Sequence, residues 1–271
     1  MRKTATLFLV LISIIFLAGL ANASDYKKQQ ELIDKARITI DSFISDKNLE
    51  WFRNNVKNAK ALLIIPELMK GGFFIGGSGG RGVLLVKDEV SGDWSNPAFY
   101  SIGSVSLGIQ FGGKISEVVM MVMTVKGLES LYGSSFKLGG DMSVAAGPVG
   151  ATAEGGTAPS RNIDYLSFAR SKGVFAGVSL DGAVVKTNDE WNSAYYGASV
   201  KPSDILVSRS VANADADLLR HTVTKATSGI TTEEEKAEDQ EEKGLTEEKE
   251  GELLKKETEI EQIREKYQEK K

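Results

Sequence analysis

The residue types that most often carry enzymatic chemistry are scarce in this chain. Cysteine is absent, and the single histidine, His221, lies outside the glycine-rich part of the sequence. A Cys–His pair or a Ser–His–Asp triad needs a base that a third group orients, and a zinc site of the usual kind needs several histidine or cysteine ligands. We therefore expect no catalytic residues, no metal site and no cofactor, with His221 at the surface.

Carboxylates leave one catalytic alternative open. Asp141 and Glu154 lie in the same glycine-rich stretch, and a hydrolase that used them would need a deep polar pocket around both side chains. The run NADAD at residues 213–217 lacks the glycine and the later glutamate of a calcium-binding loop. Solvated turns and a helix start account for these acids without catalysis. We therefore predict that the protein is not an enzyme.

A glycine-rich segment carries the letters of the dinucleotide fingerprint GxGxxG, at Gly77, Gly79 and Gly82. That fingerprint follows a strand and opens a helix, with an acidic residue about 20 positions further on. Here Val83–Val86 is strand-like, so nucleotide binding is not predicted. The seven glycines between Gly71 and Gly82 instead indicate a hairpin built for close contact, with a turn at Gly76–Gly82.

Basic side chains supply the remaining candidate chemistry. Four belong to a helix expected over residues 26–46 and two flank the glycine hairpin: Lys27, Lys28, Lys35, Arg37, Lys70 and Arg81. Each lysine or arginine near an anionic leaflet contributes about 1 kcal/mol, so four to six of them would give reversible, salt-sensitive adhesion to lipid headgroups. In the alternative reading, the helix packs its apolar face on the sheet and the lysines only solvate its outer side.

The overall charge excludes one class of ligand. Residues 24–230 carry 22 basic and 21 acidic side chains, which is close to neutral. A general nucleic-acid binder has a strongly basic footprint. We therefore expect no nucleic-acid partner.

The elements that must position these residues follow from periodicity and glycine content. Apolar residues at helical spacing predict the amphipathic helix over residues 26–46 and a second, short helix over Leu49–Lys60, with Pro66 interrupting the apolar run that follows. Between Gly71 and Gly197 lie 24 of the 28 glycines, and curved antiparallel sheets use glycine at bulges and corners. The prediction is an α+β fold with a strongly curved, barrel-like antiparallel sheet, an N-terminal helix and short connecting helices.

The N-terminal end predicts export. Arg2 and Lys3 precede an apolar run, and residues 21–23 supply the small-x-small pattern of a cleavage site. We predict a signal peptide over residues 1–23 and a domain over residues 24–224, with an uncleaved anchor as the alternative. Because cysteine is absent, neither disulfides nor a lipid-modified cysteine can follow the signal.

The C-terminal end predicts a linker and a charged tail over residues 225–271. Residues 231–271 contain 16 acidic and 9 basic side chains and a single aromatic residue, so they cannot bury a core and should be disordered or form a solvated helix. Leu253, Ile260 and Tyr267 stand seven residues apart, which is an incomplete coiled-coil pattern. Binding of a partner helix by the tail therefore stays open.

Several ordered segments make the chain similar to the SYLF domain family, a lipid-binding family also described as an actin-binding domain after its fungal members. The matching segments read AKALLIIP from Ala59, KGGF from Lys70, GRGVLL from Gly80, SVSLGIQFG from Ser104, LGGD from Leu138, AGPVG from Ala146, SKGVFAGVSLDG from Ser171, and the closing Asn192, Tyr195, Tyr196 and Gly197. With the preceding helix, the resemblance covers nearly all of the expected domain.

The resemblance implies an α+β domain that binds anionic phospholipids without catalysis. An exported chain without the Src-homology or FYVE modules of eukaryotic members resembles the bacterial branch, whose compartment contains no actin. We therefore expect contact with the lipids of an envelope membrane, a periplasmic or secreted protein that is peripheral on that membrane, and no actin partner. The alternative is a protein-interaction or scaffold module that acts through the charged tail.

Overall fold

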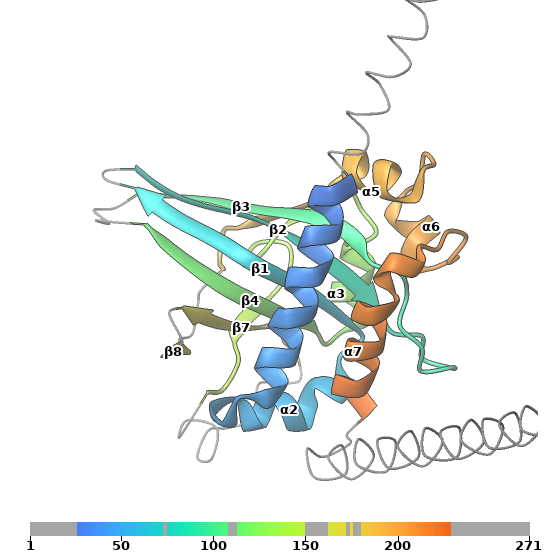
Figure 1. Ribbon diagram of the computed structural model, residues 1–271. Coiled ribbons are helices and arrows are strands. Elements are labelled where there is room, and N and C mark those ends of the chain that lie inside the picture. Colours follow the sequence, from blue (N-terminus) through green and yellow to red (C-terminus); the bar gives the residue numbers. More distant parts are fainter. Residues whose placement is uncertain are drawn as a thin grey trace, which may run out of the picture. The chain divides into compact units, whose positions relative to one another are not determined.

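The computed structural model describes residues 26–72, 75–107, 113–149, 162–171, 174–175 and 180–228 (Figure 1). The chain divides into two units, Met1–Gly229 and Ile230–Lys271, and all described residues belong to the first. The predicted signal peptide and tail, and Glu154, therefore lie outside the described residues. No helix in the described ranges is both long enough and apolar enough to span a membrane.

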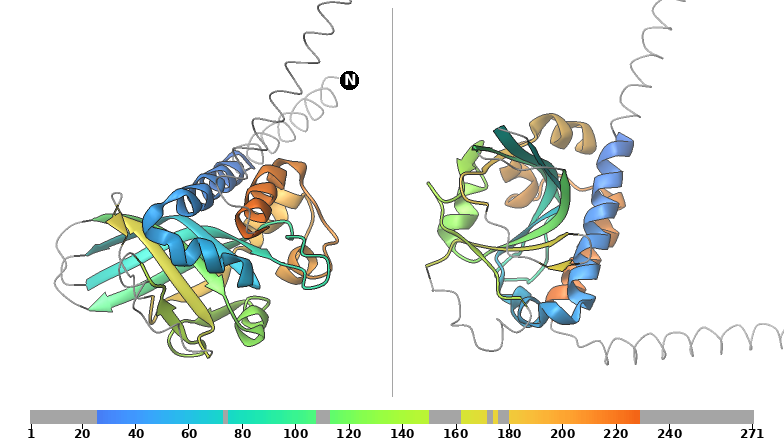
Figure 2. Two further views of the ribbon diagram at one scale, coloured as in Figure 1. Left: turned by 90° about the horizontal axis from the view of Figure 1, so that it is seen from below. Right: turned by 90° about the vertical axis from the view of Figure 1, so that its left-hand side faces the viewer.

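Nine strands of the described chain form one curled sheet, in the order β5-β9-β3-β2-β1-β4-β7-β6, with β8 paired to β7. The strands are β1 Ala61–Gly72, β2 Ile75–Val86, β3 Ala98–Leu107, β4 Lys114–Val122, β5 Ser135–Lys137, β6 Val144–Ala146, β7 Tyr165–Ser171, β8 Val174–Phe175 and β9 Val184–Thr187. All pairings are antiparallel except β6 with β7, which is parallel. The curled sheet with accompanying helices confirms the predicted α+β fold (Figure 2).

The helices lie around this sheet. A helix over residues 26–45, here called the N-terminal helix, crosses the sheet and confirms the predicted amphipathic helix. The others are η1 Lys47–Leu49, α2 Glu50–Asn55, η2 Val56–Asn58, α3 Val125–Ser130, α5 Asp189–Tyr196, α6 Pro202–Leu206, η3 Ala214–Ala216 and α7 Asp217–Ser228. In α7 the last turn begins at Lys225, where the sequence had indicated the start of a linker.

The sheet has an inner and an outer face, and each buries a separate apolar cluster. Leu63 and Leu68 of β1 belong to the inner cluster with Tyr100, whereas Leu62 and Ile64 belong to the outer cluster. The N-terminal helix, α2 and α7 cover the outer face, and Figure 2 shows the N-terminal helix on the outside of the curl. Because alternate side chains point to opposite faces, a strand buried on both sides is apolar throughout, as β4 is over Val118–Val122.

The predicted turn at Gly76–Gly82 is wrong, because these glycines lie inside strand β2. The prediction of close contact is confirmed at Gly82, where a Cβ would lie 2.5 Å from the Ile64 carbonyl oxygen. The register of β1 against β2 shifts between Ile64 and Glu67, and β1 continues through Pro66 at this bulge. A bulge is one of the few places where a sheet tolerates proline.

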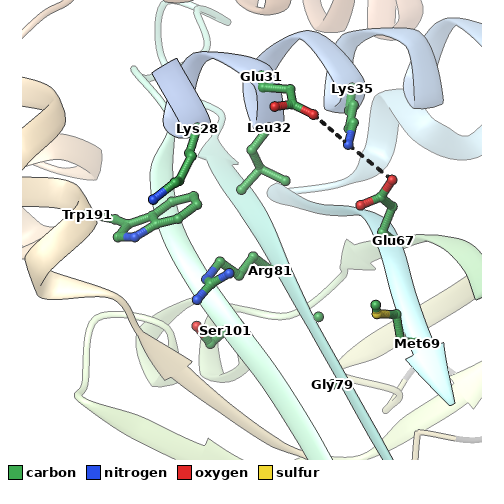
Figure 3. Close-up of a pocket in the computed structure, with 11 residues that line it drawn as sticks. Lys28, Glu31, Leu32, Lys35, Glu67, Met69, Gly79, Arg81, Ser101 and Trp191 are labelled. Carbon is green, nitrogen blue, oxygen red and sulfur yellow. Dashed lines mark hydrogen bonds and ion pairs between the residues drawn. The ribbon is translucent and has the colours of Figure 1, made fainter. Parts of the chain in front are cut away.

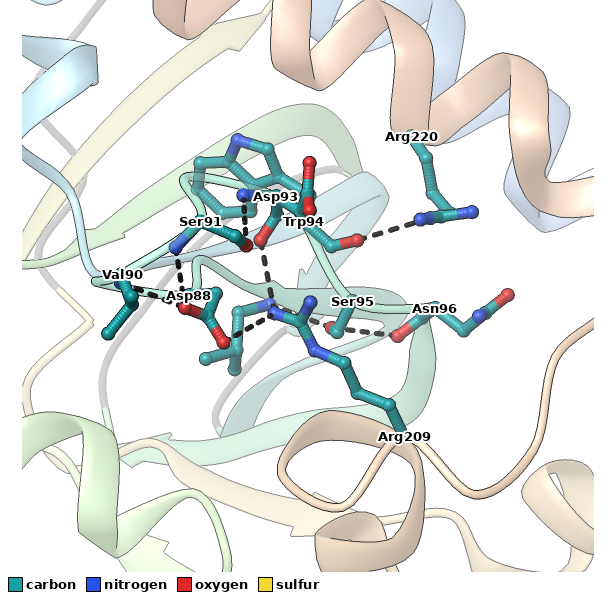
Figure 4. A network of polar contacts seen from close by, with 10 residues as sticks. Asp88, Val90, Ser91, Asp93, Trp94, Ser95, Asn96, Arg209 and Arg220 are labelled. Atoms are coloured by element: carbon teal, nitrogen blue, oxygen red, sulfur yellow. Dashed lines mark hydrogen bonds and ion pairs between the residues drawn. The ribbon is translucent and has the colours of Figure 1, made fainter.

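Short polar contacts fasten α7 to the β2–β3 connection (Figure 4). Arg220 Nε donates to the Trp94 carbonyl oxygen at 3.1 Å, and the indole Nε1 of the buried Trp94 donates to Thr227 Oγ1 at 3.0 Å. Arg209 Nη2 donates to the Asp93 carbonyl oxygen at 3.0 Å. These contacts attach α7 and the segment around Arg209 to the connection between β2 and β3, two strands that carry the candidate site.

Candidate anion-binding groove on the outer face

A groove of about 530 Å³ lies on the outer face, where the N-terminal helix passes over β1, β2 and β3 (Figure 3). Its lining combines three cations, two carboxylates and apolar groups: Lys28, Lys35, Arg81, Glu31, Glu67, Leu32, Met69 and Trp191, with Gly79, Gly80 and Ser101. The groove therefore combines donors for an anion with an apolar wall.

Arg81 and Trp191 form one side of the groove. The guanidinium carbon of Arg81 lies 4.6 Å from the centroid of the indole ring, a distance at which a cation is attracted by the ring face. Asn188 caps α5 by accepting from the Trp191 backbone N–H at 3.2 Å, and Gln29 Nε2 donates to the Trp191 carbonyl oxygen at 3.2 Å. These hydrogen bonds fix the backbone of Trp191 between α5 and the N-terminal helix, and its indole lies against the Arg81 guanidinium.

Lys35 forms the opposite side and is paired with two acids. Its Nζ lies 2.9 Å from a Glu31 carboxylate oxygen and 3.1 Å from one of Glu67. Hydrogen bonds to Glu31 and then Glu67 raise the pKa of Lys35, and the bond to Lys35 lowers the pKa of Glu31. Since these three side chains together carry one negative charge, the positive character of the groove comes from Lys28 and Arg81.

The structure brings together three of the six cations proposed from sequence. Lys28, Lys35 and Arg81 line the groove, whereas Lys27, Arg37 and Lys70 are not among its lining residues. Lys70 lies on the inner face, two residues after the inner-core Leu68. The fold therefore does not bring all six cations together in one basic rim. The role of each cation in lipid contact stays a prediction.

Sequence reasoning missed the two acids and the aromatic residue of this groove. Glu31 stands four positions before Lys35, a spacing that brings two side chains together on a helix and could have indicated the pair. Glu67 faces Arg81 in the β1–β2 register, and Trp191 reaches the groove from α5. No local signal in the sequence places these two residues beside the N-terminal helix.

A second cavity, of about 590 Å³, includes Asp141, one of the two acids that a hydrolase would use. It is lined by Asp141 and Asp164 among others. Asp164 accepts hydrogen bonds from Thr124 Oγ1 and from both N and Oγ of Ser143, at 3.0 and 2.8 Å. Burial alone would raise the pKa of Asp164, but these hydrogen bonds outweigh it and lower the pKa. Asp164 therefore acts as a structural acceptor.

The other candidate residues for chemistry are dispersed. Asp141 is exposed and accepts from the Lys137 backbone N–H at 2.9 Å, and Glu154 lies outside the described residues. His221 is exposed on α7, as predicted. Within the described ranges, no cluster of three histidine, aspartate or glutamate side chains could hold a metal ion. The absence of enzymatic activity stays a prediction.

Comparison with known proteins finds a family that the chain resembles. Residues 103–226 match the family model described as Ysc84: Las17-binding protein actin regulator. Over these residues the chain is similar to the Ysc84/SYLF family, in agreement with the resemblance predicted from the sequence. It is 30% identical over 163 residues to the human SH3 domain-containing YSC84-like protein 1, covering 60% of this chain and 47% of that protein. It is 32% identical over 158 residues to LAS seventeen-binding protein 3 of Saccharomyces cerevisiae, covering 57% of this chain and 34% of that protein.

These comparisons confirm the resemblance to the family and correct one prediction about partners. The matching family is described as an actin regulator, and the yeast relative is named for binding LAS seventeen. The expectation that excluded an actin-related partner is therefore wrong. It rested on an inferred compartment, whereas the family description and the name of the yeast protein refer to protein partners. Because the match spans only a third to a half of these relatives, the activities of the whole proteins do not transfer directly to this chain.

Proposed function

We propose that this Ysc84/SYLF-like domain is a non-catalytic binding module whose outer-face groove takes the phosphate of an anionic phospholipid headgroup at a membrane surface. The convergence of Lys28 and Arg81 beside Trp191 carries this proposal. An ammonium and a guanidinium are the usual donors to phosphate oxygens. The indole belongs to the residue types that favour a membrane interface, where one end of the ring is apolar and the other is wet.

The charge balance supports weak and reversible adhesion. The groove holds three cations and two carboxylates, so its net charge is +1. One net positive charge contributes about 1 kcal/mol near an anionic leaflet, and the effect decays within about a Debye length. Lys27 adds a further exposed cation on the same helix. The sequence of residues 231–271, with its excess of acids, would oppose tight binding.

The proposed setting is an exported chain that lies peripherally on an envelope membrane. It is supported by the sequence of residues 1–23, which has the basic start, apolar run and small-residue site of an export signal. The groove itself would work on any anionic leaflet that it can reach. The setting and the binding chemistry are therefore tested separately.

Charge reversal tests the proposal. We expect Lys28→Glu and Arg81→Glu, alone and together, to weaken co-sedimentation of the full chain with phosphatidylglycerol vesicles. Lys47→Glu is the matched control, because Lys47 is exposed on η1 and does not line the groove. Each reversal changes the groove by two charges, or about 2 kcal/mol, which corresponds to about a 30-fold weaker partition. Equal binding by the double variant and the control would refute the groove as the site.

A second candidate function is binding of an actin-related protein. It is favoured by the description of the matching family and by the name of the yeast relative. Co-sedimentation with actin filaments tests it directly. Deletion of Thr231–Lys271 separates the two sources of protein binding: loss on deletion would place the partner on the tail, and retention would place it on the domain. Lipid adhesion should survive or strengthen after the same deletion.

A further inference from the structure

A row of polar side chains crosses four adjacent strands on the inner face of the sheet. Lys70 of β1 lies directly opposite Lys114 of β4 and, on its other side, opposite Ser78 of β2. Ser78 in turn lies opposite Ser104 of β3. Figure 1 shows these strands side by side in the order β4, β1, β2, β3.

The direction of this row follows from its neighbours. Leu68, two residues before Lys70, and Val118, four residues after Lys114, both belong to the inner cluster. Since alternate residues of a strand share a face, Lys70 and Lys114 point to the inner side of the curl. Arg81 and the groove are on the outer side. The row is thus separate from the groove described above.

The two lysines form an unfavourable pair as they stand. Directly opposite residues of antiparallel strands have Cβ atoms about 4.5 to 5.5 Å apart, and like charges at such positions are destabilising. Lys70 is half-buried; that burial, and after it the charge of Lys114, lower its pKa. Among the described residues, neither ammonium makes a hydrogen bond or an ion pair. By contrast, Lys60, Arg170 and Arg220 each have a carboxylate partner.

Hydroxyl groups complete the row. Ser78 Oγ and Ser104 Oγ lie 2.7 Å apart, so one donates to the other and the second keeps its proton for another acceptor. One step further into the curl, the Ser116 side chain is 1% exposed and its hydroxyl has no hydrogen-bond partner among the described groups. A buried hydroxyl without a partner is costly. Ser116 follows Lys114 by two residues and shares its face.

We propose that this row binds a divalent tetrahedral oxyanion of the phosphate class between Lys70 and Lys114, with serine hydroxyls as further donors. Two ammonium groups match the charge of such an anion, and its several oxygens can accept from both lysines at once. The anion would convert a like-charge repulsion into two attractions. The same chemistry could come from free inorganic phosphate or from the phosphomonoester of a lipid headgroup.

Thermal unfolding of the full chain in inorganic phosphate tests the site, with sodium chloride at equal ionic strength as the reference. We expect phosphate to raise the Tm of the unaltered chain, because a ligand that binds only the folded state stabilises it. Lys70→Met and Lys114→Met should each weaken phosphate binding at least tenfold, while Lys47→Met leaves it unchanged.

The Tm measured in sodium chloride shows whether Lys70→Met acts only by destabilising the fold. Without phosphate, Lys70→Met should melt no lower than the unaltered chain, because it removes one partner of a like-charge pair. A Tm of the unaltered chain that phosphate and sulfate leave unchanged would overturn the proposal. So would a phosphate shift that survives in both Lys70→Met and Lys114→Met.

Vesicles separate the two sources of the anion. If Lys70→Met lowers binding to phosphatidic acid vesicles, which present a phosphomonoester, but not to phosphatidylglycerol vesicles, the site takes a headgroup. If Lys70→Met loses the rise of Tm in inorganic phosphate while its affinities for both kinds of vesicle stay the same, the site takes a free anion. Because Lys70 and Lys114 do not line the outer groove, their variants test this site separately, and its failure and that of the groove are distinguishable.

Discussion

Exchange of one charge in the outer groove should change membrane adhesion in a direction set by the sign of that charge. Glu67 and Arg81 face each other across β1 and β2, and both line the groove. Glu67→Gln raises the net charge of the groove from +1 to +2 and releases Lys35 from one of its two acid partners. Arg81→Gln lowers it to 0.

The size of the effect follows from the same count. One charge near an anionic leaflet is worth about 1 kcal/mol, which is about a fivefold change in partition. We therefore expect Glu67→Gln to bind anionic vesicles about fivefold more tightly than the unaltered chain, and Arg81→Gln about fivefold more weakly. The double variant should return close to the original affinity. The exposed Lys35–Glu67 pair contributes at most about 1 kcal/mol to stability, so the variants should stay folded.

Vesicle co-sedimentation over a lipid titration measures these partitions, with Lys47→Gln as the control for loss of a cation elsewhere. At about 0.1 M salt the Debye length is about 10 Å, and the difference between the two variants should shrink as salt is raised. Weakening by both variants, or an Arg81→Gln affinity equal to that of Lys47→Gln, would refute the electrostatic reasoning.

Three further predictions concern the scaffold. Gly82→Ala should lower the free energy of unfolding, measured in urea, by about 3 kcal/mol because its Cβ would meet the backbone of β1. Gly79→Ala should change it very little, since the nearest atom to its Cβ is 3.9 Å away. Equal stabilities of the two variants would contradict the close approach at Gly82. Asp164→Asn should lower the free energy of unfolding by about 1 to 3 kcal/mol at neutral pH. Because the folded pKa of Asp164 is below its unfolded value of about 3.9, this deficit should close as pH falls through the folded pKa, and a pH-independent deficit would refute the assignment. Trp94→Phe should lower the free energy of unfolding by about 1 kcal/mol or more, because Thr227 Oγ1 loses the hydrogen bond from the indole N–H; an unchanged Tm would contradict a stabilising role for this bond.

Local chemistry in the sequence predicted some elements closely. The N-terminal helix follows from its apolar spacing. Residue types that favour a cap and a stop bound α5, with Asn188 at its start and Gly197, which adopts a left-handed φ of 65°, at its end. The doubly buried β4 follows from its continuous apolar run. In each case the determinants lie within one element.

Non-local geometry accounts for what the sequence did not reveal. A glycine run is compatible with a turn or with a strand pressed against its neighbour, and only the β1 bulge opposite Gly82 decides between them. The groove joins Arg81 to Trp191, which is 110 positions further along the chain. The Lys70–Lys114 pair depends on strand register, which spacing in the sequence does not fix.

The most direct test of the account is co-sedimentation of the full chain with neutral phosphatidylcholine vesicles and with vesicles that contain phosphatidylglycerol or phosphatidic acid, at low and high salt. The neutral vesicles control for any adhesion by the apolar N-terminal run. The account predicts binding to the anionic vesicles that exceeds the neutral background and falls as salt rises. Equal binding to neutral and anionic vesicles, or none to either, would contradict headgroup recognition and favour the protein-binding function.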